Sequence, residues 1–183
     1  MNSENSITIV TSLPRSGTTT ICEMAKICGF RPCHVLKEDL STSLEKYNFF
    51  ADTPFYSPEY LLALCQIYKN LKFIYINRDL IEVYESMQKT NIDKYLENYL
   101  NKVDNINKKE VLQDTLCWNF IHKNKSFNHK NIIFSIAKNY SVPILEYNFN
   151  EGWDSFCSFM ECEKPKKEIP HLNKWQNYRY LKK

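Results

Sequence analysis

The segment that most constrains this chain is residues 13–20, which read LPRSGTTT. It follows a short β-branched run, Ile7–Val10, and overlaps the start of residues 18–28, whose apolar side chains recur with helical spacing. Gly17 opens this predicted helix, and a glycine, having no Cβ, lets an anion approach the first-turn amides closely. The order of strand, loop and helix therefore predicts an anion-binding loop at the end of a buried strand.

Each position of this loop offers either a hydrogen-bond donor or backbone flexibility. Arg15 carries a permanent charge and a fork of donors that suits phosphate or sulfate oxygens. Ser16, Thr18 and Thr19 add hydroxyl groups. Thr18 stands where kinases and NTPases with a phosphate-binding loop carry lysine, which disfavours such an enzyme. A simple tight turn is the alternative reading of the glycine taken alone.

Four further runs of β-branched or aromatic residues are too short for helices, and we interpret them as buried strands. They are residues 33–36, 49–51, 73–76 and 142–147. Stretches with helical periodicity lie at residues 57–68, with Ser57 as N-cap, at 80–89, and from 92 to about 140. This alternation predicts an α/β fold, a mostly parallel central sheet flanked by helices, in a single domain spanning residues 1–183.

Three loops directly follow predicted strands: residues 13–17, 52–54 and 77–79. Ligands of parallel sheets bind at the carboxyl ends of the strands. We therefore expect these three loops to meet at one edge of the sheet.

Composition narrows the class of protein. The 183 residues include 43% hydrophobic and 25% charged residues, which is typical of a soluble globular protein. No apolar run approaches the roughly 20 residues that span a membrane, and the polar N-terminus does not resemble a secretory signal. The seven cysteines show no CxxC pair, so we expect reduced thiols in a cytoplasmic protein rather than disulfides or a zinc site. A net charge of +3 is too small to indicate nucleic acid.

The segment LPRSGTTT resembles the 5′-phosphosulfate loop of sulfotransferases, which runs Pro-[Lys/Arg]-Ser-Gly-Thr-[Thr/Ser]. These enzymes use 3′-phosphoadenosine 5′-phosphosulfate (PAPS), release 3′-phosphoadenosine 5′-phosphate (PAP), and have a three-layer fold like that of P-loop nucleotide kinases. The resemblance implies that Arg15 contacts the bridging and sulfuryl oxygens. It also implies that Ser16, Gly17, Thr18 and Thr19 belong to the cofactor site, the last three holding the 5′-phosphate.

A second segment resembles the same family. Residues 72–87 read KFIYINRDLIEVYESM, a predicted strand, then Arg78-Asp79, then a predicted helix that carries Ser86 eight residues after Arg78. The family has this order and spacing, which implies that Arg78 and Ser86 bind the 3′-phosphate. Residues 49–74 and 142–165 and the tail segment IPHLNK are also similar to the family, so the resemblance covers most of the chain.

The chain departs from the family pattern in places. The turn at residues 52–54 lacks the expected lysine, and no Arg-Lys-Gly segment occurs near the C-terminus, where Lys174 and Arg179 are candidate substitutes. At 183 residues the chain is also short for this family.

Arg15 is the first predicted catalytic residue. The reaction also needs a general base that takes the acceptor's proton, and the sequence offers two candidates for it. Glu38 follows Lys37 after a predicted strand and resembles the catalytic glutamate of heparan-type sulfotransferases, with a surface ion pair as the alternative. Asp52 ends another predicted strand, with a turn-capping role as the alternative. His34 lies in an apolar run and is interpreted as a core histidine.

The leading hypothesis is a PAPS-dependent sulfotransferase that acts on a hydroxyl or amine of a small-molecule, glycan or peptide acceptor. A metal ion is not required in principle, because a cation, amides and hydroxyls can carry the developing charge. The alternatives are a P-loop kinase or NTPase, and a catalytically silent module that binds PAP or PAPS. No nucleic acid or membrane partner is expected, and no pattern indicates an oligomeric state.

Overall fold

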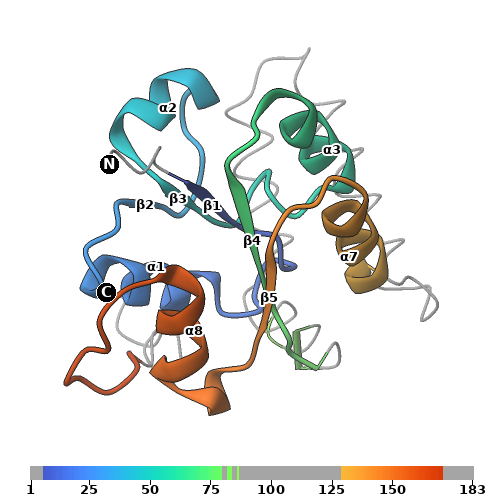
Figure 1. Ribbon diagram of the computed structural model, residues 1–183. Helices are drawn as coiled ribbons and strands as arrows, with labels where there is room; N and C mark the ends of the chain where they lie inside the picture. The colour runs from blue at the N-terminus through green and yellow to red at the C-terminus, as the bar shows by residue number, and fades with distance from the viewer. Residues whose placement is uncertain (1–5, 80–81, 84–85, 87–128, 171–183) are drawn as a thin grey trace, which may run out of the picture. The chain divides into compact units, whose positions relative to one another are not determined.

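A computed structural model describes residues 6–79, 82–83, 86 and 129–170 (Figure 1). The chain divides into two compact units: residues 1–78 with 130–183, and residues 79–129. The sheet, its helices and the loops that end its strands belong to the first unit. The single domain expected from the sequence stays a prediction.

The first unit is built on a five-stranded sheet in the order β2-β3-β1-β4-β5 (Figure 1). The strands are β1 (Ile7–Val10), β2 (Pro32–Cys33), β3 (Phe49–Phe50), β4 (Leu71–Ile76) and β5 (Ile144–Tyr147). Every neighbouring pair is parallel, and β1 lies between β3 and β4. The predicted α/β fold with a parallel central sheet is therefore confirmed, and all five strands end at the same edge.

Helices cover both faces of this sheet, as Figure 1 shows. They are α1 (Thr18–Ile27), α2 (Leu40–Lys46), α3 (Pro58–Ile67), α7 (His129–Asn139), the 3-10 helix η1 (Phe149–Glu151) and α8 (Trp153–Met160). One buried cluster joins α1 and α8 to one sheet face, and a second joins α3 and α7 to the other. Neighbouring strand residues alternate between them: Val10 belongs to the first cluster and Ile9 to the second. Burial on both faces explains why the strands read as continuous apolar runs.

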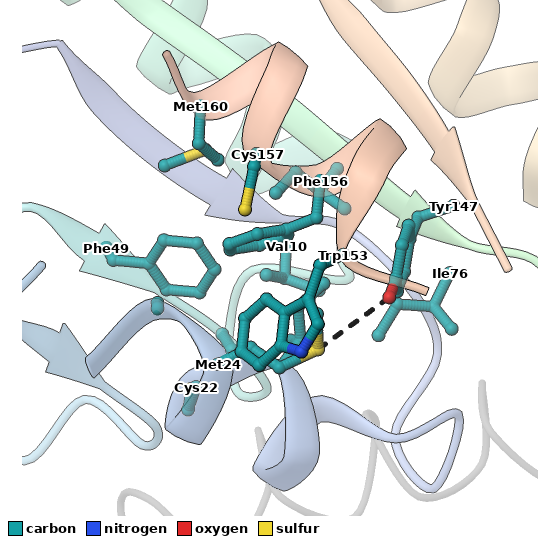
Figure 2. Close-up of a cluster of buried hydrophobic side chains, with 14 residues drawn as sticks. Val10, Cys22, Met24, Phe49, Ile76, Tyr147, Trp153, Phe156, Cys157 and Met160 are labelled. Atoms are coloured by element: carbon teal, nitrogen blue, oxygen red, sulfur yellow. Dashed lines mark hydrogen bonds between the residues drawn. The ribbon is translucent and has the colours of Figure 1, made fainter. Parts of the chain in front are cut away.

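Figure 2 shows the cluster under α1 and α8. Met24 and Phe156 are fully buried there, and Tyr147 donates a hydrogen bond to the sulfur of Met24 at 3.7 Å. Burying a side chain of this size stabilises the fold by about 1.5–3 kcal/mol. Most of what anchors α1, and with it the loop before α1, is therefore apolar packing.

Several element bounds differ from the sequence-based expectation. Strand β2 stops at Cys33 instead of running to residue 36, because the chain then turns and the amide of Leu36 bonds the carbonyl of Thr53 at 3.3 Å. Helix α2 was not expected, because its seven residues are too few to establish a helical period, although Leu40 and Leu44, one turn apart, pack against the second cluster. Ser57 caps α3 as predicted, with its side chain accepting from the amide of Tyr60.

Two predicted helices fall partly outside the described residues. For the helix expected at residues 80–89, Glu82, Val83 and Ser86 are helical. For the stretch from 92 to about 140, the described part is α7.

Candidate functional site

The loop at residues 13–17 leaves β1 and is held to the neighbouring strand β4. The amide of Thr11 donates to the carbonyl of Ile74 at 2.9 Å, and the hydroxyl of Ser12 accepts from the amide of Ile76. Farther along, both the amide and the hydroxyl of Ser16 donate to the carbonyl of Leu13, at 3.2 and 2.6 Å. The Ser16 side chain is thus buried and shapes the turn, which fixes where the backbone amides of the loop point.

Gly17 is the N-cap of α1 and adopts φ 114°, a conformation that favours glycine. A Cβ at this position would lie 2.5 Å from Cε2 of Phe149, a residue of η1. Glycine is therefore required here because the ring of Phe149 occupies the place of a Cβ. The first-turn amides of α1, at the positive end of the helix dipole, have no side-chain cap hydrogen bond at Gly17 and no acidic residue in their own turn.

The second predicted loop meets the first. Arg78 follows β4, and its Nη1 donates to the carbonyl of Arg15 at 2.6 Å. Arg15 itself has φ 69°, a left-handed backbone conformation that is uncommon for a residue other than glycine, and this conformation sets the direction of its carbonyl. The structure thus brings Arg15 and Arg78 together beside the N-terminus of α1.

The third predicted loop also reaches this edge of the sheet. Asp52 follows β3, and its Oδ2 accepts a hydrogen bond from the hydroxyl of Thr18 at 3.2 Å. Asp52 has φ 63°, and its carbonyl accepts from the amide of Phe55 at 2.7 Å, which is the turn-forming role considered as its alternative. Burial of the Cys22 thiol raises its pKa to about 12, and the negative charge of the Asp52 carboxylate is the second cause of this rise.

His34 is a site residue that the sequence interpretation missed. Its Nε2 lies 3.1 Å from the hydroxyl of Thr18, 3.2 Å from that of Thr19 and 3.5 Å from Oδ2 of Asp52. The side chain is 36% exposed, so the interpretation as a core histidine was wrong. The reason is that β2 ends at Cys33, which makes His34 the first residue after a strand. The sequence predicted a strand over residues 33–36, so no loop was expected to begin at His34.

Glu38 lies in a different environment. Its two carboxylate oxygens accept hydrogen bonds from Nζ of Lys46 at 2.8 and 2.9 Å, and Oε1 is 3.4 Å from the hydroxyl of Ser43. The hydrogen bond to Glu38 raises the pKa of Lys46. These contacts match the surface ion pair considered as its alternative, and its role as a catalytic base stays a prediction.

Ser86 is half-buried and helical, as expected for a residue on the helix after Arg78. It belongs to the second compact unit, so its assignment to the 3′-phosphate stays a prediction. Lys174 and Arg179 lie outside the described residues. Within the described part of the chain, no helix is both long enough and apolar enough to span a membrane.

A family model described as a sulfotransferase domain matches residues 34–178. The matched range begins with His34 and includes Asp52, Arg78 and Ser86, while the loop at residues 13–17 precedes it. No curated protein matches the chain. Because the family model covers well over half of the chain, the chain belongs to the sulfotransferase family.

Proposed function

We propose that this sulfotransferase takes its sulfuryl group from PAPS and passes it to a hydroxyl or amine of a small-molecule, glycan or peptide acceptor. The observation that carries the proposal is the 2.6 Å hydrogen bond from Arg78 to the carbonyl of Arg15, beside the N-terminus of α1 opened by Gly17. Two arginines at one helix N-terminus suit a ligand with two separate anionic groups. PAPS has two such groups, a 3′-phosphate and a 5′-phosphosulfate.

The residues at the loop fit this ligand. Gly17 has no room for a Cβ, the first turn of α1 lacks acidic side chains, and the guanidinium of Arg78 donates to the carbonyl of Arg15 two residues before Gly17. The proposed cofactor residues are Arg15, Ser16, Gly17, Thr18, Thr19, Arg78 and Ser86. When bound, PAPS supplies the activated sulfur–oxygen bond that breaks in the reaction. Arg15 stabilises the charge that develops on the oxygens around that bond.

His34 is the candidate base that the contacts favour, with Asp52 as its partner. Sulfuryl transfer leaves a proton on the acceptor oxygen or nitrogen, and a neutral imidazole nitrogen can take that proton. The carboxylate of Asp52, 3.5 Å from Nε2, stabilises the imidazolium that results. The hydroxyls of Thr18 and Thr19 orient the ring against the loop. Glu38 remains the second candidate, because it also follows β2.

Calorimetric titration of the purified protein with PAP, against ADP with Mg²⁺ in parallel, tests the cofactor class. We expect PAP to bind without a metal ion, and ADP with Mg²⁺ to bind much more weakly. A preference for ADP with Mg²⁺ would assign the chain to the alternative class of kinases or NTPases. Binding to neither would show that residues 13–20 form a turn without a nucleotide.

Turnover separates an enzyme from a silent PAP-binding module. Conversion of PAPS to PAP is measured with a panel of phenols, sugars and amines as acceptors. Acceptor-dependent PAP release supports the proposed reaction and identifies the acceptor class. Tight PAP binding with no release across the panel would favour the silent module.

A further inference from the structure

Three cysteines from distant parts of the chain meet at one place in the first compact unit. The sulfurs of Cys28, Cys157 and Cys162 all lie within 4.8 Å of one another. Cys157 is buried and belongs to α8, where Figure 2 shows it beside Phe156, while the other two are half-buried. A zinc–sulfur bond of about 2.3 Å places tetrahedral sulfurs roughly 3.8 Å apart. Shifts of about 1 Å would therefore bring these three atoms to ligand distances.

The carboxyl ends of two helices converge on this cluster. Cys28 is the C-cap of α1, and its amide bonds the carbonyl of Met24 at 3.1 Å. Glu161 is the C-cap of α8, and the amide of Cys162, the next residue, bonds the carbonyl of Cys157 at 3.1 Å. A helix carboxyl end carries partial negative charge, which favours a cation. The cluster thus combines three soft donors with an electrostatic preference for positive charge.

The cluster lies at the margin of the hydrophobic core between α1 and α8. Cys157 is one of the buried members of that core, and Cys28 and Cys162 pack against it. A partly buried environment strengthens the attraction between a cation and thiolates. The cysteines are also remote from the proposed anion site, since Cys28 follows Thr18 by ten residues along α1, or about 15 Å.

A reactive redox pair is the competing explanation, and the same features argue against it. Reactive cysteines occur at helix amino ends or beside cations, where thiolate is stabilised. Here the sulfurs lie at helix carboxyl ends. A bound cation, by contrast, replaces the thiol protons and satisfies all three sulfurs together.

We propose that Cys28, Cys157 and Cys162 bind one thiophilic cation of the Zn²⁺ type, with a fourth position open to water. The ion joins the end of α1, which carries the anion-binding loop at its other end, to the end of α8. Its role is structural, and it takes no part in sulfuryl transfer. This departs from the expectation of no zinc site, which rested on the absence of a CxxC pair. Cys157 and Cys162 are separated by four residues, a spacing that zinc ligands also use, whereas Cys28 joins them only through the fold.

The test uses the full-length protein, reduced and treated with a chelator, and then titrated with Co²⁺. We expect one equivalent of Co²⁺ to produce the absorption of thiolate-to-cobalt charge transfer, and Zn²⁺ to displace it. Cys28→Ser and Cys162→Ser each remove one ligand and should weaken Co²⁺ binding by at least about 100-fold, because even the loss of an outer-shell partner costs about 10–100-fold. Cys65→Ser is the matched control, since Cys65 is buried on α3 in the opposite core cluster.

Thermal unfolding supplies a second readout that does not depend on cobalt. Zn²⁺ should raise the unfolding temperature of the wild type and of Cys65→Ser, and leave that of Cys162→Ser unchanged. Absence of a charge-transfer band in the wild type, or a band that survives in both ligand variants, would refute the site. Mass spectrometry after exposure to air in the presence of one equivalent of Zn²⁺ tests the competing explanation: a disulfide that still forms within the cluster would overturn the metal proposal in favour of a redox pair.

Discussion

Individual side chains at the carboxyl edge of the sheet have separable tasks. Arg78 donates to the backbone of the anion-binding loop, whereas His34 and Asp52 contact the hydroxyl of Thr18. A guanidinium is permanently charged and is suited to binding an anion, while an imidazole can accept and release a proton near neutral pH. Substitutions at these positions should therefore affect binding and turnover differently.

Arg78→Ala should weaken the binding of PAP far more than that of 5′-AMP, which lacks the 3′-phosphate. A charge-assisted hydrogen bond contributes about 1.5–3 kcal/mol, so we expect PAP affinity to fall roughly 10- to 100-fold. Calorimetry with both nucleotides measures the difference. Arg31→Ala is the control, because Arg31 is exposed and donates to the carbonyl of Glu45 near α2. Equal losses for PAP and 5′-AMP would show that Arg78 does not recognise the 3′-phosphate.

His34→Gln should lower kcat by about 10²–10⁴-fold, the usual contribution of a general base, with PAP affinity changed only a few-fold. Asp52→Asn should show a smaller loss of the same kind, because it removes only the charge that stabilises the imidazolium. Glu38→Gln is the comparison, since the carboxylate of Glu38 is paired with Lys46. Steady-state rates of PAP release distinguish the three. If Glu38→Gln loses turnover and His34→Gln keeps it, Glu38 is the base.

At the level of elements, the ends of helices carry the site and much of its local stability. The N-terminus of α1 is shaped by Gly17 and overlaid by Phe149 from η1, while α2 begins at a capping aspartate, Asp39. The unsatisfied amides at a helix N-terminus need partners. Asp39 supplies one for α2 by accepting from the amide of Thr42, whereas Gly17 gives α1 no side-chain cap. The two helices therefore respond to different perturbations.

Gly17→Ala should cost about 2–4 kcal/mol of unfolding free energy, since it adds strain at positive φ to a clash with the ring of Phe149. Gly29→Ala is the matched control: Gly29 has φ 86°, and among the described residues no atom lies within 4 Å of the place that an alanine Cβ would occupy. Strain alone should therefore cost about 1 kcal/mol there. Urea unfolding of the two variants measures both values. Equal costs would mean that Phe149 moves aside without penalty.

The cap of α2 makes a pH-dependent contribution to stability. The hydroxyl of Ser41, and then Thr42 through its hydroxyl and amide, hydrogen-bond the carboxylate of Asp39 and lower its pKa. A lowered folded-state pKa stabilises the fold above the unfolded value, about 3.9, and that contribution is lost as pH falls. Wild type should therefore exceed Asp39→Asn in stability at pH 7, with the gap closing in acid. A gap that is constant with pH, measured by urea unfolding, would contradict this origin.

For the whole molecule, ligand binding and folding are coupled. The proposed PAP site is assembled from loops after β1, β2, β3 and β4, so it exists only when the sheet has formed. PAP at about 100 times its dissociation constant should stabilise the folded state by about 2.7 kcal/mol. Thermal unfolding with PAP and with adenosine tests this, and adenosine should have little effect. Equal shifts with both ligands would indicate recognition of the base instead of the phosphates.

Local patterns were enough to predict most of the scaffold and part of the site. Short apolar runs indicated the strands, because a strand buried on both faces must be apolar throughout. The loop at residues 13–17 was identifiable because its glycine, arginine and hydroxyls are contiguous. Helix α2 was not, since its seven residues carry only two apolar side chains, Leu40 and Leu44, which is too short a repeat to indicate a helical period. Its capping residue, Asp39, is a signal that many turns share.

What the sequence determined by itself was most of the elements and some of the residues that end them, such as the Ser57 cap of α3, since period, caps and glycines act over a few positions. What only the tertiary structure decided was proximity. The strand order β2-β3-β1-β4 brings His34, Asp52 and Thr18 together, and no local pattern specifies which parallel strands become neighbours. The same holds for Cys28 and Cys157, which meet because α1 and α8 pack on one face of the sheet. Contacts between distant segments depend on how buried faces combine, and that is a property of the folded core.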